Sequence, residues 1–150
     1  MNAVFGDTFY FLGLLNRADE SHSRCAGFAR EYRGLVVTSA YVLVEVADGL
    51  AKPQHRVQTA RFIQALQTHA QVRIVPASQM LLARGLEFYA ARPDKEWSLT
   101  DCISFLVMAD ESIREALTGD RHFQQAGFVP LLTERSGSGS ESPQRIGCSG

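Results

Sequence analysis

Short apolar runs alternate with longer amphipathic stretches along most of this chain. The run formed by Leu35, Val36 and Val37 is wholly apolar and β-branched in character, which is typical of a strand covered on both faces. Apolar residues at helical spacing follow this run, and the pattern recurs after a second run at 72–75. Strands that alternate with helices form βαβ units. The sequence therefore predicts the α/β class, as a three-layer α/β/α sandwich with a central parallel sheet.

The limits of the elements follow from prolines, glycines and capping residues. Strands are expected near residues 4–6, 35–37, 72–76, 116–119 and 128–132. Helices are expected near residues 8–15, 19–32, 39–50, 57–66 and 80–89, from Ser98 onward, and as a short turn at 122–125.

The chain divides into a folded part and a tail. Its length of 150 residues fits one domain. From residue 136 the chain is rich in Ser and Gly, and Ile146 is the one large apolar residue there. Such a segment has too little apolar surface to join a core. We therefore expect one domain over residues 1–135 and a flexible tail over residues 136–150.

Composition narrows the class of protein. The net charge is -1, which neither supports nor excludes a nucleic-acid partner. The three cysteines are odd in number and lack metal-ligand spacing, which favours reduced thiols in an intracellular protein. The amino terminus lacks the pattern of a signal peptide, and the apolar run at 9–15 is too short to span a membrane. We therefore expect a cytoplasmic protein without a membrane anchor.

Three aspartates stand at the ends of apolar elements. Asp7 follows the first expected strand, Asp120 follows the fourth, and Asp101 lies in the first turn of the helix that leads into the fourth. Each has a purely structural interpretation, because aspartates cap helices and Asp101 stands three residues after Ser98, as in a capping box. In a parallel sheet, however, the loops after the strands share one edge, and ligands bind there. We therefore expect the three carboxylates to converge.

Glu45 is a fourth acid of interest. It lies between the apolar residues Val44 and Val46, and a partly buried carboxylate needs a partner. Four carboxylates in one small space cannot all stay ionised without a cation. Because no His or Cys is expected between these oxygen ligands, Mg2+ or Mn2+ is favoured over zinc. A hard divalent ion in an acidic pocket suits the hydrolysis of phosphate esters by an activated water.

Five segments together resemble a known family. They include Phe-Gly-Asp-Thr-Phe at 5–9, Trp-Ser-Leu-Thr-Asp-Cys-Ile-Ser-Phe at 97–105 and Leu-Thr-Gly-Asp-Arg-His-Phe at 117–123, with shorter matches at 16–22 and 44–45. In these segments, in their order and spacing, the chain resembles PIN domains, above all the small ribonucleases typified by the VapC toxins of bacterial toxin–antitoxin pairs. The resemblance covers roughly residues 1–133.

The resemblance implies a PIN-like domain with a metal-dependent endoribonuclease site. The family's acidic quartet, which would hold Mg2+ or Mn2+, falls on Asp7, Glu45, Asp101 and Asp120. Its small hydroxyl residue near the metal falls on Thr8, with Thr118 as the second candidate. The resemblance also implies an RNA substrate, a small antitoxin protein as partner and a homodimer.

Four further polar or aromatic residues have simpler expected roles. Arg121 directly follows Asp120 and is expected to contact a substrate phosphate. His22 and His122 are expected to make polar contacts at the starts of helices. Trp97 is expected to cover the core rather than to stack on a base.

Two other functions are open. The first is a PIN module that binds RNA or protein without cutting RNA. The intact acidic quartet argues against this function. The second is a phosphotransfer domain, because an aspartate after the first strand also suits a phosphoacceptor. Phe9 stands where that class often has a second aspartate, and the only lysines, Lys52 and Lys95, do not lie at strand ends. The sequence therefore favours the ribonuclease.

Overall fold

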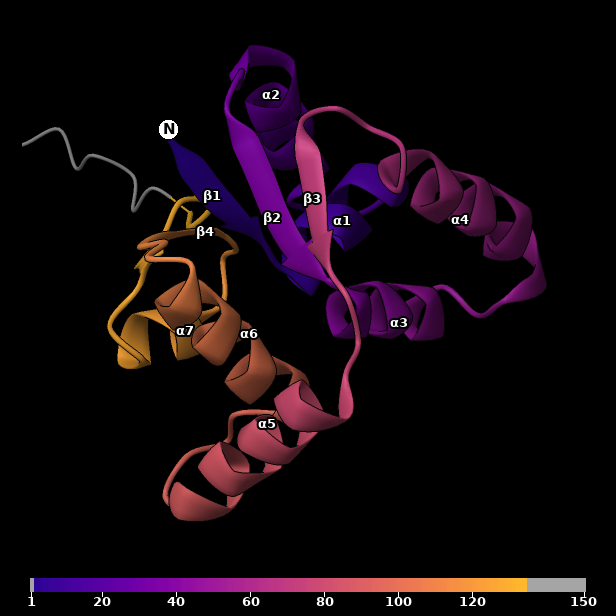
Figure 1. Ribbon diagram of the computed structural model, residues 1–150. Helices are drawn as coiled ribbons and strands as arrows, with labels where there is room; N and C mark the ends of the chain where they lie inside the picture. The colour runs from indigo at the N-terminus through magenta and orange to yellow at the C-terminus, as the bar shows by residue number, and fades with distance from the viewer. Residues whose placement is uncertain (1, 135–150) are drawn as a thin grey trace, which may run out of the picture.

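The computed structural model describes residues 2–134, which contain a sheet of five strands (Figure 1). The strands are β1 (Ala3–Gly6), β2 (Leu35–Ser39), β3 (Val72–Val75), β4 (Glu115–Leu117) and β5 (Val129–Pro130). Their order is β3-β2-β1-β4-β5, so β1 is central. All pairings are parallel; Val4 is aligned with Val36, and Phe5 with Ala116. The predicted parallel sheet is confirmed, while the expected tail at 136–150 lies outside the described residues.

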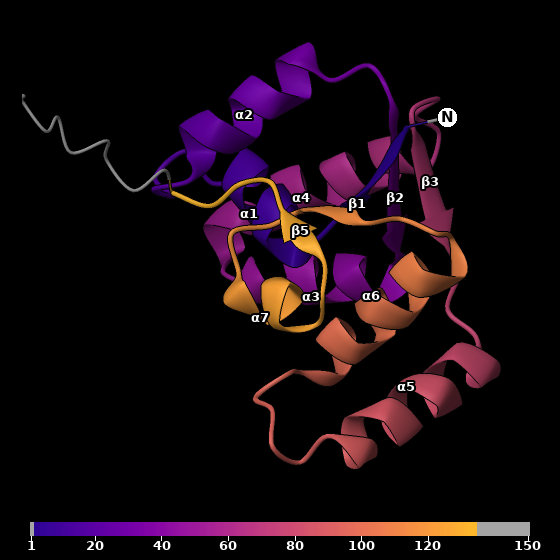
Figure 2. The ribbon, with the colours of Figure 1, turned by 90° about the vertical axis from the view of Figure 1, so that its left-hand side faces the viewer.

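Helices cover both faces of the sheet (Figures 1 and 2). They are α1 (Thr8–Leu15), α2 (His22–Glu31), α3 (Ala40–Gly49), α4 (Pro53–Leu66), α5 (Gln79–Ala91), α6 (Leu99–Asp110) and α7 (Arg121–Gln125). α1, α2 and α4 lie over one face, and α6 and α7 lie over the other, with α5 packed on α6. The predicted three-layer sandwich is therefore present. Within residues 2–134, no helix is long and apolar enough to cross a lipid bilayer.

The central strand β1 is buried on both faces because its residues alternate between the two helical layers. Phe5 is fully buried and its ring lies 6.4 Å from that of Phe123 in α7. Gly6 faces the opposite layer, where an added Cβ would lie 2.8 Å from the ring of Phe11 in α1. A side chain at residue 6 would therefore push α1 away from the sheet, and with it the residues at the start of that helix.

The parallel sheet places several polar residues at one edge. β1 ends at Gly6 and is followed by Asp7, while β4 ends at Leu117 and is followed by Thr118. β2 ends at Ser39, whose side chain accepts a hydrogen bond from the Val42 backbone N–H and so begins α3. Because strand ends in a parallel sheet point the same way, these residues share the carboxyl edge.

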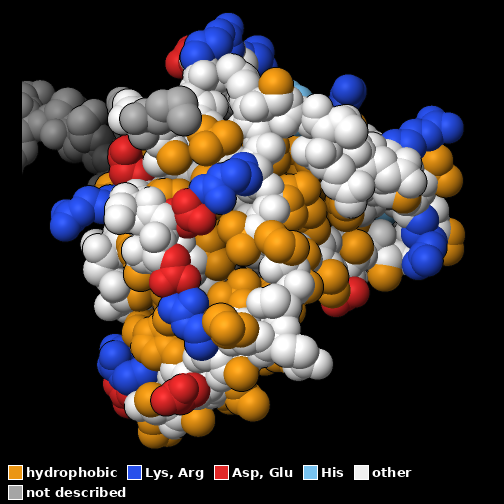
Figure 3. Space-filling model, in the orientation of Figure 1, with side chains coloured by type: hydrophobic (Ala, Val, Ile, Leu, Met, Phe, Trp, Pro, Cys, Tyr) orange, Lys and Arg blue, Asp and Glu red, His pale blue; other side chains and the backbone are white. Residues whose placement is uncertain are grey.

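The edge strand β3 borders a hollow that is largely apolar (Figure 3). Two ion pairs lie beside it: Arg73 of β3 pairs with Glu111, and Arg84 of α5 pairs with Asp110 at 2.7 Å. Both pairs are partly exposed, so each contributes little to stability. The hollow is lined by Val75, Pro76, Ser78, Met80, Leu81 and Val107 together with residues of these pairs.

Candidate active site

Asp7 occupies the N-cap position of α1 but does not cap the helix with its side chain. Its carboxylate instead accepts a hydrogen bond of 2.8 Å from the hydroxyl of Thr118, which is fully buried after β4. The same hydroxyl oxygen accepts a bond of 3.0 Å from the Asp120 backbone N–H. Thr118 therefore joins the loop after β1 to the loop after β4.

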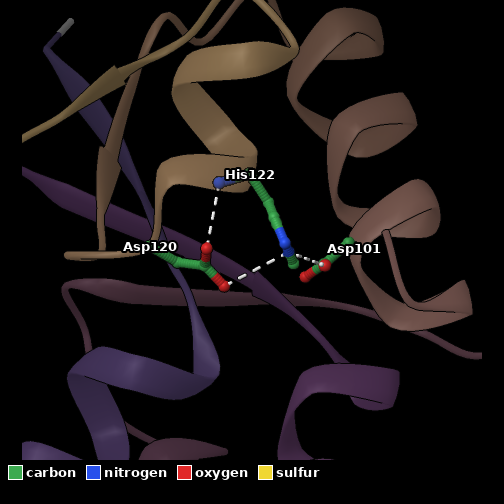
Figure 4. Close-up of side chains that lie close together, drawn as sticks. All are labelled: Asp101, Asp120 and His122. Atoms are coloured by element: carbon green, nitrogen blue, oxygen red, sulfur yellow. Dashed lines mark hydrogen bonds and ion pairs between the residues drawn. The ribbon is translucent and has the colours of Figure 1, made fainter. Parts of the chain in front are cut away.

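Asp120 and His122 form a compact turn at the start of α7 (Figure 4). The Oδ1 atom of Asp120 accepts a hydrogen bond of 2.9 Å from the His122 backbone N–H. The His122 ring points toward two carboxylates: its Nδ1 lies 3.4 Å from Asp120 Oδ2 and 3.0 Å from Asp101 Oδ2. His122 therefore connects α7 to the first turn of α6.

Asp101 also forms the predicted capping box of α6. Its backbone N–H donates to the Ser98 hydroxyl at 3.0 Å, and its own Oδ2 accepts from the Ser98 backbone N–H at 3.1 Å. The box fixes the position of the carboxylate relative to the helix axis. The capping interpretation and the site interpretation of Asp101 are thus compatible.

The carboxylates influence each other electrostatically. Burial raises the pKa of Asp7 from 3.8 to about 7; the Thr118 hydrogen bond opposes this shift, and the charges of Asp101 and Glu45 add to it. Burial also raises the pKa of Asp101, against the His122 hydrogen bond, and the charge of Asp120 raises it further. The four acids therefore lie close enough for their charges to interact.

The remaining predicted site residues, Glu45, Thr8 and Arg121, make none of the hydrogen bonds that join the three aspartates. Glu45 is half-buried on α3, and within the described residues it acts on Asp7 through its charge rather than through a hydrogen bond. Thr8 is 7% exposed, and its hydroxyl has no hydrogen-bond partner among the described residues. Arg121 is largely exposed, with its guanidinium 3.8 Å from the Glu96 carboxylate. A phosphate contact by Arg121 stays a prediction.

Two residues that were expected to be structural have such contacts. His22 lies at the start of α2, and its Nδ1 is 2.8 Å from the Gly13 carbonyl oxygen. Trp97 is 4% exposed and donates a hydrogen bond of 3.1 Å from Nε1 to Gln125. Trp97 is therefore part of the core, and its ring is not available to stack on a base.

The donor atoms fit a divalent cation. Ligand atoms of Asp101, Asp120 and His122 all lie within 4.8 Å of one another. A bound cation would also lower the cost of ionising the buried Asp7, and the free hydroxyl of Thr8 could accept or donate a further bond. A ring nitrogen of His122 also lies between two of the carboxylates, and the expected set of oxygen ligands did not include it.

Comparisons with known proteins agree with this arrangement. A family model described as "PIN domain" matches residues 4–129. The 23S rRNA-specific endonuclease VapC20 of Mycobacterium tuberculosis is 30% identical over 132 residues, which are 87% of this chain and 99% of that protein. The crystal structure of VapC20, described as a sarcin–ricin loop cleaving toxin, superposes with a TM-score of 0.78 and 26% identity over 85% of this chain and 98% of that chain.

Two more distant structures share the fold. The crystal structure of VapBC2 from Rickettsia felis, bound to a fragment of promoter DNA, has a TM-score of 0.60. Its sequence is 14% identical, over 86% of this chain and 97% of that chain. FitAcB from Neisseria gonorrhoeae has a TM-score of 0.58 and 17% identity, over 85% of this chain and 94% of that chain. With the match of the family model over most of its length, the chain belongs to the PIN-domain family and is related to the VapC toxin ribonucleases.

Proposed function

We propose that this protein is a metal-dependent endoribonuclease and the toxin of a toxin–antitoxin pair. One observation carries the proposal: a continuous set of contacts links Asp7, Asp120 and Asp101 through Thr118 and His122. These aspartates come from three separate parts of the chain. A fold does not require such a convergence of acids, two of them buried, which costs stability in the absence of a cation.

The proposed site has a division of roles. Mg2+ or Mn2+ would be held by Asp7, Glu45, Asp101 and Asp120, directly or through water. When bound, the ion would lower the pKa of a water molecule and neutralise charge on the phosphodiester.

The surrounding residues would orient the ligands and the substrate. Thr118 holds the Asp7 carboxylate, and Ser98 holds that of Asp101. Thr8 would orient a water or a carboxylate, and Arg121 would bind a phosphate of the RNA. No covalent intermediate with the chain is expected, because the Thr118 hydroxyl, which donates to the Asp7 carboxylate, is fully buried.

The proposed substrate is an exposed loop of RNA. The similarity to VapC20 extends over 99% of that protein, which cleaves 23S rRNA. The chains are nevertheless only 30% identical, and loop contacts that select one RNA can change at that distance. A sarcin–ricin loop oligonucleotide is therefore the first substrate to test, followed by intact ribosomes and a panel of single-stranded RNAs.

The test is an RNA digestion by the purified protein in Mg2+ or Mn2+, against EDTA. We expect site-specific cleavage with metal and none with EDTA. Asp7→Asn and Asp101→Asn should each lower the rate by more than about 100-fold, since loss of even an outer-shell partner of a metal typically costs 10–100-fold. The matched control is Asp110→Asn, because Asp110 pairs with Arg84 on the surface, at the end of α6 opposite to Asp101.

Two outcomes would contradict the proposal. Cleavage that persists in EDTA and in both site variants would come from a contaminant or a different mechanism. A folded, metal-binding protein that cuts none of the RNAs would instead favour the non-cleaving PIN module that binds RNA or protein.

We further propose a small antitoxin protein as partner, together with a homodimer and a cytoplasmic location. Support comes from membership of the PIN family and from large apolar side chains that are exposed in the isolated chain. These side chains are Val44, Val57, Met80, Leu82, Leu86, Tyr89 and Val129. Exposed apolar surface of this kind is common where a protein binds another.

A further inference from the structure

The His122 side chain lies at the centre of the candidate site. Its Nδ1 atom faces both Asp101 Oδ2, at 3.0 Å, and Asp120 Oδ2, at 3.4 Å (Figure 4). His122 is 19% exposed and Asp101 is 10% exposed, whereas Asp120 is 39% exposed. The three donor atoms therefore form a small group that is closed on the side of α6 and open toward solvent at Asp120.

Two of the three distances among these atoms, those from the His122 Nδ1 atom, match the distances between neighbouring ligands of one ion. Ligands about 2.1 Å from a divalent metal are about 3.0 Å apart when they subtend a right angle, and about 3.4 Å apart at the tetrahedral angle. The two distances from Nδ1 have these values. The turn that binds Asp120 Oδ1 to the His122 backbone N–H leaves Asp120 Oδ2 and the ring nitrogen facing each other (Figure 4).

We infer that His122 is itself a metal ligand through Nδ1, completing a site of two carboxylates and one imidazole with Asp101 and Asp120. This inference rests on the proposed metal-dependent function and adds a nitrogen donor to the oxygen ligands. Imidazole favours Mn2+, Co2+ and Zn2+ over Mg2+, which binds oxygen almost exclusively. The protein should therefore bind Mn2+ or Co2+ more tightly than Mg2+.

The decisive variant is His122→Asn. An Asn side chain can still donate a hydrogen bond to Asp101, so it keeps a role of His122 in positioning that carboxylate, but it has no ring nitrogen. In calorimetric titrations without RNA, we expect Mn2+ affinity to fall at least about tenfold, the lower end of typical losses at metal sites. Mg2+ affinity should change much less. His69→Asn is the matched control, because His69 is exposed in the loop before β3, at the opposite edge of the sheet.

Electron spin echo spectroscopy of bound Mn2+ provides a direct second measurement. We expect a nitrogen coupling in wild type and in His69→Asn, and its absence in His122→Asn. Equal losses of Mn2+ and Mg2+ affinity, with no nitrogen coupling in wild type, would overturn the inference and leave His122 as a positioning residue. A rise in Mn2+ affinity in His122→Asn would also overturn it, because the imidazole would then compete with the ion.

Neither the metal titration nor the spin echo spectrum uses RNA cleavage. The proposed ribonuclease and the proposed His122 ligand can therefore be rejected independently of each other. Nitrogen coupling in a protein that cuts no RNA would remove the proposed ribonuclease and keep His122 as a ligand. Metal-dependent cleavage with no nitrogen coupling would keep the proposed ribonuclease and remove His122 as a ligand.

Discussion

Asp7 is a carboxylate at the end of the central strand and is only 5% exposed. Burial raises its pKa from 3.8 to about 7. Between these values the unfolded chain releases the proton while the folded chain keeps it, so the folded state loses stability as pH rises from about 4 to about 7. Each unit of pKa difference corresponds to about 1.4 kcal/mol. Ionised Asp7 is therefore a cost to the fold unless a cation is present.

This cost predicts a pH-dependent effect of Asp7→Asn. In EDTA, the variant should unfold at a higher temperature than wild type at pH 8, and at nearly the same temperature at pH 4. Mn2+ should reverse the order at pH 8, because it stabilises only the protein that binds it. Thermal unfolding followed by circular dichroism at the two pH values measures both effects.

Asp110→Asn is the control for that experiment. The Arg84 hydrogen bond lowers the pKa of Asp110, so its substitution should give no gain in stability at pH 8. If Asp7→Asn lowers the unfolding temperature at pH 8 in EDTA, the ionised carboxylate stabilises the fold through Thr118 and the site is not under electrostatic strain.

At the level of residues, the sequence predicted which acids approach one another but missed the nitrogen between two of them. Asp7 and Asp120 could be placed together because both follow strands of one parallel sheet. The contact of His122 with Asp101 could not, because it joins residues 21 apart through the packing of α7 on α6. A local signal existed: His122 stands two residues after an expected N-cap, where a short turn brings the two side chains together.

Among the elements, α6 has the strongest link between local structure and the site. Its capping box holds Asp101 by two hydrogen bonds to Ser98. α5 begins with a simpler cap, in which the Ser78 hydroxyl accepts from the Leu81 backbone N–H at the same distance of 3.0 Å. Substitutions of the two serines therefore separate the loss of a helix cap, which both share, from a change in the site, which only Ser98 adjoins.

We expect Ser98→Ala and Ser78→Ala each to lower the free energy of unfolding by about 1 kcal/mol, the usual value of an N-cap. Ser98→Ala removes the bond from the Asp101 backbone N–H, while the backbone N–H of residue 98 can still donate to the Asp101 carboxylate. Only Ser98→Ala should also weaken Mn2+ binding, by about tenfold, because the helical turn that carries Asp101 is then less firmly held. Urea unfolding and calorimetric titration give the two quantities. Equal Mn2+ affinity in the two variants would show that the capping box does not orient the ligand.

The order and type of the elements were predicted well, and their ends less well. The second helix was expected to have Asp19 as its cap, but α2 begins at His22 with Ser21 as its N-cap. The Asp19 carboxylate instead accepts bonds from the backbone N–H and hydroxyl of Ser21 and forms a separate turn. The expected last strand at 128–132 is only Val129–Pro130. Hydrogen bonds to the β4 segment nevertheless continue beyond this strand, because the Leu131 and Leu132 backbone N–H groups donate to the carbonyl oxygens of Ala116 and Thr118. Pro130 lies between two donating residues of an edge strand, where its missing N–H removes no bond to β4.

The proposed binding of an antitoxin can be tested on the whole molecule. Expressed together, the chain and the product of an adjacent reading frame should form a complex of larger mass than the chain alone, with reduced RNA cleavage. Asp7→Asn should form the same complex, because its change is buried at the sheet edge and leaves the exposed apolar side chains intact. Light scattering after gel filtration measures the mass. Free chain and unchanged cleavage in the mixture would reject that partner.

The position of β1 in the middle of the sheet has a consequence for the synthesis of the protein. Asp7 is made among the first residues, but the hydroxyl that binds it belongs to Thr118, 111 residues later. At roughly 5–20 residues per second, on the order of ten seconds separate the two on the ribosome. For most of that interval the nascent chain lacks Asp101 and β4, and Asp120 is added only after Thr118. If the protein is the proposed ribonuclease, it would thus remain inactive on the ribosome until residue 120 has been added.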